Sequence, residues 1–259
     1  MGEILRYEHV DVSYNGMPAV RDISFSLEEG EILGIVGESG SGKSTLIRAA
    51  MGLLGDTGMV TRGDIYYKGK NLPDLSEREM RKLRASELGM IFQNAGSSLC
   101  SIRTVGAQLY ESMKEHMPIS KSEFRKQAAE LFAKVGFEDM DRILASYPFE
   151  LSGGMAQRVG IAAAMLMNPS VLFADEPTSA LDVSIQKQVA QEMLTVRKTF
   201  GTSIILVTHN IGLVRFMADR VLIMRTGECV EYGDMEQVLS DPKHEYTKRL
   251  LAAVPKLVR

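Results

Sequence analysis

The residues best suited to chemistry form a glycine-rich loop near the start of the chain. They match the pattern GxxxxGK[ST] at every fixed position, between an apolar run typical of a buried strand and a helical pattern. Glycines let successive backbone N–H groups turn toward phosphate oxygens, and the helix that follows adds its positive end. The candidate phosphate-binding residues are Gly37, Glu38, Ser39, Gly40, Ser41, Gly42, Lys43, Ser44 and Thr45. The pattern predicts nucleoside triphosphate binding, with Lys43 reaching the β- and γ-phosphates and Ser44 ligating Mg²⁺.

A pair of acids follows a second apolar run, residues 171–174. In a doubly wound sheet the ligand lies beyond the carboxyl ends of the strands, where such acids can reach it. We expect Asp175 to hold Mg²⁺ through water and Glu176 to polarise the attacking water as general base. His209 follows another buried-strand pattern, residues 204–207, and could contact the γ-phosphate or orient Glu176.

The sequence LSGGMAQR at residues 151–158 separates this chain from other nucleotide-dependent machines. It resembles the LSGGQ signature of ABC transporter ATPases. The order of motifs also fits that family: phosphate loop, Gln93 after a strand, signature, Asp175 and Glu176, residues 179–182, then His209. The resemblance covers essentially the whole chain and implies an ATPase that binds ATP and Mg²⁺.

Roles for individual residues follow from this resemblance. Tyr14 is similar to the aromatic residue that stacks on adenine. Gln93 is similar to the glutamine that senses Mg²⁺ and water and faces the permease. Residues 179–182 resemble the D-loop, and His209 resembles the switch histidine. The resemblance thus implies three catalytic residues, Glu176, His209 and Gln93, and three groups around the metal, Ser44, Gln93 and Asp175.

The signature is itself an anion site, because Ser152, Gly153 and Gly154 lie at a predicted helix N-terminus. In the family, these residues face the γ-phosphate bound by the opposite subunit, so each hydrolytic site is shared between two ATPase chains. Met155 stands where the signature usually has Gln, and a thioether cannot replace the hydrogen bonds of an amide. Either the contact across the subunits is altered, or the change is neutral because backbone N–H groups bind the phosphate.

Several segments resemble the branch of the family that takes up oligopeptides, dipeptides and nickel. They are residues 147–150, residues 154–155, residues 181–183 and the tail at residues 244–251, in which Glu245 replaces the usual proline. The chain stops at Arg259 without the cysteine cluster of many peptide-transporter members, so we expect no iron–sulfur site. The shorter form favours the nickel-type members weakly.

Composition limits the alternatives. The chain has 259 residues, a net charge of −3 and two distant cysteines. Near-neutral charge is not the footprint of a nucleic-acid binder. No stretch approaches the roughly 18 apolar residues that span a bilayer. We therefore expect a peripheral protein on the cytoplasmic face of the cell membrane, held there by protein partners.

The elements that must position these residues alternate between strand and helix, which favours a mainly parallel sheet. Strands are predicted over residues 5–14, 20–27, 32–36, 64–67, 88–92, 171–174 and 203–207, with a hairpin over residues 220–232. Helices are predicted over residues 44–54, 120–135, 153–168 and 182–200, with a capping box at Ser120 and Glu123.

The predicted fold is an α/β P-loop NTPase of the RecA-like type. It has an N-terminal antiparallel β part, a parallel core at residues 1–94 and 169–259, and an inserted helical subdomain at residues 95–168.

The leading hypothesis is an ATP-hydrolysing subunit of an importer for peptides or nickel complexes. It would pair with a second ATPase chain, related but distinct or identical, and bind two permease subunits in a groove near residues 93–101. A solute-binding protein outside the cell would deliver the cargo. One alternative is a soluble ABC ATPase of DNA repair or translation, although the coiled-coil insertion or tandem cassette of those proteins is missing. A non-hydrolysing nucleotide switch is the other, disfavoured by Glu176 and His209.

Overall fold

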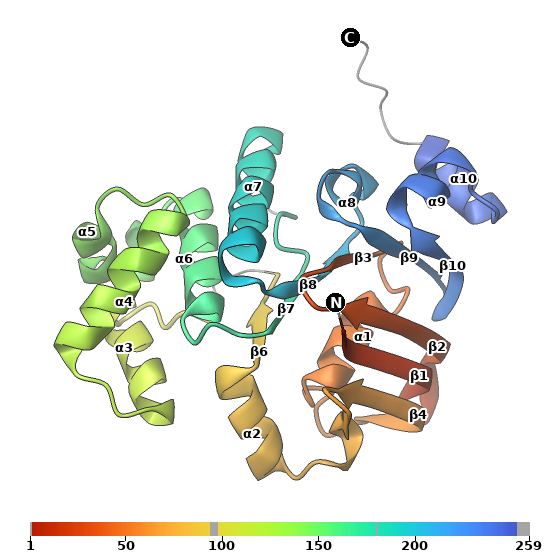
Figure 1. Ribbon diagram of the computed structural model, residues 1–259, viewed down its shortest axis with the longest axis horizontal. Helices are drawn as coiled ribbons and strands as arrows, with labels where there is room; N and C mark the ends of the chain where they lie inside the picture. The colour runs from red at the N-terminus through yellow and green to blue at the C-terminus, as the bar shows by residue number, and fades with distance from the viewer. Residues whose placement is uncertain (1, 94–97, 180, 253–259) are drawn as a thin grey trace. The chain divides into compact units, whose positions relative to one another are not determined.

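The computed structural model describes residues 2–93, 98–179 and 181–252 (Figure 1). The chain forms two compact units. The first comprises Met1–Met80 and Ser203–Arg259, and the second comprises Arg81–Thr202. Within the described residues, no helix has both the length and the apolar character needed to cross a membrane.

An antiparallel sheet in the first unit has the strand order β2-β1-β4-β5. Its strands are β1 (Glu3–Tyr14), β2 (Met17–Glu28), β4 (Gly58–Tyr67) and β5 (Lys70–Asn71). The alternating apolar pattern is confirmed, because Leu5, Val10 and Val12 are fully buried on β1. Asn15 and Gly16 link β1 to β2 with φ of 49° and 76°, the positive values that a tight hairpin turn requires.

A parallel group in the same unit surrounds β3 (Ile32–Gly37), which pairs in parallel with β8 (Ser203–Thr208) and β9 (Arg220–Arg225). Every residue of β3 and β8 is buried, as continuous apolar runs predict. The predicted hairpin is also confirmed: β9 turns at Thr226 and Gly227, both at positive φ, into antiparallel β10 (Glu228–Asp234).

Helix α1 (Lys43–Ala50) contacts strands of both sheet groups in the first unit, namely β1, β2 and β4 on one hand and β3 and β8 on the other. It ends earlier than the predicted Leu54, because the chain turns at Gly52, whose φ is 63°. Four further elements complete this unit: η1 (Leu72–Asp74), α8 (Ile211–Met217) packed on β3 and β8, and α9 (Met235–Ser240) and α10 (Glu245–Ala252) packed on β10.

The second unit contains two parallel strands, β6 (Leu88–Ile91) and β7 (Val171–Asp175). Its helices are α3 (Val105–His116), α4 (Lys121–Lys134), α5 (Met140–Ala145), η3 (Pro148–Glu150), α6 (Gly153–Met165) and α7 (Val183–Phe200), and α2 (Glu77–Ser86) leads into it. The unit extends beyond the predicted subdomain at residues 95–168 on both sides, since it includes β6, β7 and α7.

The helix ends in this unit can be compared with the capping residues and boundaries predicted from the sequence. The capping box is confirmed: Ser120 accepts from the Glu123 N–H, and the Glu123 carboxylate accepts from the Ser120 N–H. Helix α6 ends at Met165 rather than Asn168, which sits at φ 53° ahead of a proline. Asp182 is the N-cap of α7, at the predicted start of that helix, and it makes no side-chain capping bond.

Candidate functional site

The phosphate loop connects β3 to α1 in the first unit. Gly40 and Gly42 have φ of 79° and 94°, a backbone conformation that side chains other than glycine rarely adopt. Gly42 is also the N-cap of α1, and it has no side chain to occupy the first N–H groups of the helix. The loop therefore presents backbone donors and a helix N-terminus to an anion, as its sequence predicts.

Neighbouring backbone encloses this loop and explains its glycines. A Cβ on Gly37 would lie 2.2 Å from the Met224 carbonyl oxygen, and a Cβ on Gly42 would lie 2.8 Å from that of Ala19. The tip of the β9–β10 hairpin also holds the loop, because the Gly227 N–H donates to the Ser41 carbonyl at 3.2 Å. The loop is thus folded into its cradle shape by its own chain.

Lys43 is only 6% exposed, although it carries a charge. Its ammonium donates to the carbonyl oxygens of Gly37 and Glu38, both at 2.8 Å, so the charge sits over the start of the loop. Ser44 and Thr45 are half-buried in the first turn of α1. A lysine held within its own loop is a compact positive charge placed where phosphates would bind.

Two more predicted residues belong to this unit. Tyr14 ends β1 and is half-buried, and a Cβ on Gly58 would lie 2.6 Å from its Cε1 atom, so its ring lies against the Gly58 backbone. His209 is exposed directly after β8, whose Thr208 is in register with Val36 of β3. His209 and the phosphate loop therefore leave the same edge of the sheet.

In the second unit, the acids and the predicted glutamine follow two paired strands. Ala174 of β7 is in register with Ile91 of β6, so Asp175 and Gln93 both lie at the carboxyl ends of these strands. Asp175 is 3% exposed, whereas Gln93 is exposed. Parallel strands place such side chains at one edge, the position in which α/β proteins bind ligands.

Glu176 has an unusual backbone for a residue with a large side chain. Its φ is 50°, in the left-handed region, which costs on the order of 1 kcal/mol for a residue other than glycine. The Glu176 carbonyl accepts from both the N–H and the hydroxyl of Ser179 at 3.2 Å, which holds this turn in place. The predicted D-loop, residues 179–182, includes Ala180, which lies outside the described residues.

The signature begins helix α6. Ser152 is the N-cap and accepts from the Met155 N–H at 3.4 Å, and both Ser152 and Gly153 are exposed. A Cβ on Gly153 would meet only ordinary contact, with Leu181 Cδ2 at 3.7 Å. Among the residues that the structure describes, none comes close enough to require glycine at this position.

The structure adds contacts that the sequence patterns missed. Arg158, at the end of the signature, pairs with Glu192 of α7 at 3.3 Å and donates to the Gly136 carbonyl. Burial raises the pKa of Glu192 to about 7, against the opposing effect of the Arg158 guanidinium. In the first unit, the Tyr246 hydroxyl reaches the phosphate loop. Neither contact has a local signal, because the partners are far apart in the sequence.

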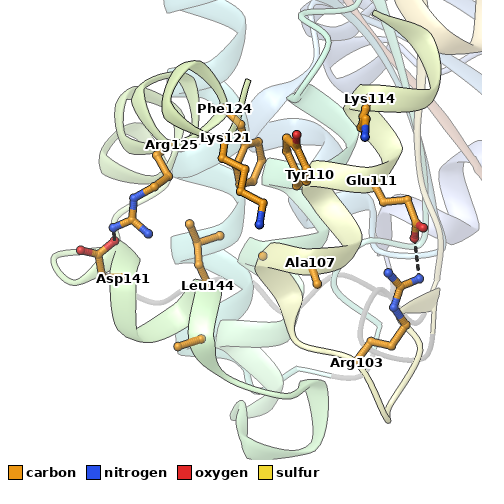
Figure 2. A pocket seen from close by; sticks show the side chains of 12 residues that line it. Arg103, Ala107, Tyr110, Glu111, Lys114, Lys121, Phe124, Arg125, Asp141 and Leu144 are labelled. Carbon is orange, nitrogen blue, oxygen red and sulfur yellow. Dashed lines mark hydrogen bonds and ion pairs between the residues drawn. The ribbon is translucent and has the colours of Figure 1, made fainter. Parts of the chain in front are cut away.

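A cavity of about 540 Å³ lies among α3, α4 and α5 of the second unit (Figure 2). Tyr110, Phe124 and Leu144 give it apolar walls, and Lys114 and Lys121 lie at its rim. Two ion pairs also border it, Arg103 with Glu111 and Arg125 with Asp141. The groove predicted near residues 93–101 includes residues 94–97, which lie outside the described residues.

Comparison with known families agrees with this geometry. Residues 20–179 match the family model described as "ABC transporter", which is more than half of the chain. The chain belongs to the ABC transporter family. The family predicted from the signature and the motif order is therefore confirmed.

The ABC transporter relatives include importer subunits. OppD of Bacillus subtilis (strain 168), an oligopeptide transport ATP-binding protein, is 46% identical over 95% of this chain and 69% of OppD. DppD of Lactococcus lactis subsp. cremoris (strain MG1363), a dipeptide transport ATP-binding protein, is 40% identical over 98% of this chain and 74% of DppD. GsiA of Escherichia coli (strain K12), a glutathione import ATP-binding protein, is 42% identical over 99% of this chain, which spans only 43% of GsiA. These likenesses confirm the predicted peptide-uptake branch of the ABC transporter family.

Solved ABC transporter structures show the same fold. The cassette MJ0796, in a dimeric post-hydrolysis state bound to ADP and Pi, has a TM-score of 0.78 and 28% identity, covering 90% of this chain and 99% of that one. CbiO1 from Clostridium perfringens, part of the transporter complex cbiONQ, has a TM-score of 0.82 and 28% identity, covering 98% and 97%. The predicted α/β fold of a P-loop NTPase is confirmed.

Proposed function

We propose that this chain is the ATP-hydrolysing subunit of an importer that takes up peptides. The observation that carries the proposal is the buried Lys43 within a loop of left-handed glycines, in a chain 46% identical to an oligopeptide transport ATP-binding protein. ATP supplies the free energy for transport, and its hydrolysis yields ADP and phosphate.

The residues of the first unit account for binding of the nucleotide. Tyr14 stacks on the adenine, and Lys43 leaves the Gly37 and Glu38 carbonyls to pair with the β- and γ-phosphates. His209 contacts the γ-phosphate from the same edge of the sheet. This arrangement requires little reorganisation, because the loop already has its cradle shape.

The proposed groups around Mg²⁺ are three oxygen-bearing side chains, Ser44 of the first unit and Asp175 and Gln93 of the second. The Ser44 hydroxyl lies in the first turn of α1, Asp175 is a buried carboxylate, and Gln93 offers an amide oxygen. Such hard oxygen donors, few in number and supplemented by phosphate oxygens, are what Mg²⁺ prefers in proteins. When bound, Mg²⁺ would neutralise charge that develops on the phosphates.

Glu176 is the proposed general base. It accepts a proton from the water that attacks the γ-phosphorus, while the bond between that phosphorus and the oxygen of ADP breaks. The left-handed turn held by Ser179 fixes the direction in which Glu176 leaves β7. A strained backbone at the end of a buried strand is typical of such positions.

The signature serves the nucleotide of a second ATPase chain. Ser152 and Gly153 are exposed at the start of α6, and the space around Gly153 shows that its own chain does not demand a glycine there. A glycine kept at an exposed helix N-terminus allows close approach of a phosphate from outside. We infer that two chains, identical or related, share each hydrolytic site.

The helical part of the second unit is the proposed contact with the permease subunits. The cavity among α3, α4 and α5 has apolar walls and two lysines at its rim (Figure 2). Two large apolar side chains of the same unit, Ile102 and Phe149, are 83% and 73% exposed. Through such a surface, the protein would be held at the cytoplasmic face of the membrane, while a solute-binding protein delivers the cargo outside the cell.

The proposal is tested in vesicles that contain the chain, its permease subunits and the solute-binding protein. We expect hydrolysis of ATP with Mg²⁺ to rise when the binding protein is loaded with peptide, and labelled peptide to accumulate. A nickel complex in place of peptide is the second arm of the test. Recovery of the chain with nucleic acid rather than with permease subunits would contradict the proposal.

A further inference from the structure

The C-terminal helix α10 contacts the phosphate loop through one tyrosine. The Glu38 N–H donates to the Tyr246 hydroxyl at 3.2 Å, although the two residues are 208 positions apart. Tyr246 is 8% exposed, so water does not readily replace this bond. The N–H of the second residue of the loop is thereby directed toward α10.

The surroundings of Tyr246 keep its hydroxyl neutral. Burial and the nearby Glu38 carboxylate raise the pKa of Tyr246, and the Arg225 guanidinium, 5.3 Å from the ring centroid, opposes them in part. A neutral hydroxyl can accept from the Glu38 N–H and donate to a carboxylate at the same time. The contact is therefore suited to fix the backbone of Glu38.

A carboxylate on β10 fixes the start of α10. Glu231 accepts from the N–H groups of Lys243 and His244, at 2.8 and 3.1 Å. Burial alone would raise the pKa of Glu231, but these two backbone bonds lower it, so the carboxylate stays ionised. Thr247 is fully buried beside Tyr246. Tyr246 thus approaches the loop from a rigid base.

We propose that Tyr246 is a positioning residue for nucleotide binding, whose hydroxyl holds the Glu38 amide and thereby the start of the phosphate loop in the shape that receives phosphates. This inference rests on the proposed function of the loop as the ATP site. Gly40 and Gly42 follow Glu38, and glycine is the residue with the greatest backbone freedom. The loop therefore needs hydrogen bonds from other segments of the chain to keep one conformation. The hairpin tip supplies one such hydrogen bond at Ser41, and Tyr246 supplies another at Glu38.

The test is Tyr246→Phe, which removes the hydroxyl and keeps the ring beneath Arg225. We expect the Kd for Mg²⁺-ATP, measured by calorimetry on the full chain, to rise about five- to tenfold, because the part-buried Glu38 N–H loses its partner and the loop must be ordered on binding. In the vesicles, KM should rise with kcat changed less than twofold. Hydrogen exchange of the Glu38 amide without nucleotide should accelerate at least about tenfold.

Tyr232→Phe is the matched control. The Tyr232 hydroxyl also accepts a backbone N–H, that of Ser26 at 3.1 Å, and in addition it donates to the Ser26 carbonyl and accepts from Arg220. The control should therefore lower the melting temperature at least as much as Tyr246→Phe does, while leaving the Kd and the exchange of Glu38 unchanged.

A wild-type Kd for Tyr246→Phe, or an equal rise in the control, would overturn the inference. Lys43→Ala separates this failure from that of the proposed function. If Lys43→Ala abolishes ATP binding while Tyr246→Phe has no effect, only the inference is wrong. If Lys43→Ala binds ATP normally, the loop is not the ATP site.

Discussion

Two helix N-termini in this chain are candidate phosphate sites, and they are built in opposite ways. The phosphate loop before α1 is enclosed: Lys43 is buried, and Gly37 and Gly42 are required by the backbone around them. The signature before α6 is open: Ser152 is exposed, and Gly153 has room for a side chain. The glycines of the enclosed site are required by the packing of its own chain, whereas we propose that the glycine of the open site serves a phosphate carried by another chain.

The largest expected effect is at the enclosed site. Lys43→Ala should abolish detectable ATP binding and reduce hydrolysis at least about a hundredfold, because a preorganised charge on the phosphates is lost. Calorimetry with Mg²⁺-ATP measures the binding. Lys70→Ala, an exposed lysine of the same unit, is the control and should behave as wild type.

Next in size is the proposed base. Glu176→Gln should lower kcat about a hundred- to a thousandfold while ATP binding persists, because the amide cannot accept the proton of the attacking water. With ATP bound and not hydrolysed, the paired chains should accumulate as a dimer in size-exclusion chromatography. Glu130→Gln, on the exposed face of α4, serves as the control. Full turnover by Glu176→Gln would remove Glu176 from this role.

A substitution at the open site tests most directly how it differs from the enclosed site. Gly153→Ala should fold as wild type does, because the new Cβ lies 3.7 Å from its nearest neighbour. Hydrolysis at protein concentrations that favour pairing should nevertheless fall about tenfold or more, because the methyl group separates the phosphate from the helix N-terminus. ATP binding by dilute protein should be unchanged.

Ser152→Ala adds a control for the helix cap. Loss of an N-cap costs about 1 kcal/mol, and Ser120→Ala removes an equivalent cap from α4 in the same unit. Both variants should lose similar stability, but only Ser152→Ala should lose hydrolysis. Equal activity in the two variants would show that the open site has no ligand.

The smallest effect concerns the ion pair that joins α6 to α7. The pKa of Glu192 is raised from 4.5 to about 7. The stability that Glu192 contributes through this shift is therefore fully present below about pH 4.5 and is lost as the pH rises through 7. Glu192→Gln should flatten this part of the stability profile, by on the order of 2 kcal/mol between pH 5 and pH 8. Melting temperatures across that range, compared with those of Glu130→Gln, measure the effect. An unchanged profile would mean that Glu192 does not titrate there.

The sequence predicted the positions of the enclosed site better than the reasons for its shape. Local patterns reveal the loop, β3 and the capping box at Ser120, because each depends on residues close together in the chain. Contacts across the fold leave no such pattern, so the ties from Tyr246 and Gly227 to the loop were missed. Helix ends were misplaced where backbone turns decided them, as at Gly52 and Asn168.

At the open site, the sequence identified the residues of the signature but not the space beside Gly153. The signature and its helix were predicted from the LSGG pattern, and Ser152 is indeed the N-cap of α6. The space beside Gly153 depends on Leu181, which a sequence pattern does not place. The left-handed φ of Glu176 was likewise not predictable, since glutamate rarely adopts this conformation.

The turn between β9 and β10 has a practical consequence for labelling this protein. Hairpin tips usually tolerate inserted tags and fluorophores. Here the Gly227 N–H donates to the Ser41 carbonyl, and the Gly227 carbonyl accepts from the Arg21 N–H. These two hydrogen bonds hold the tip in a fixed position. An insertion at Thr226 would disturb nucleotide affinity from a distance, whereas the turn at Lys68 and Gly69, where a Cβ on the glycine meets open space, is the safer place for a reporter.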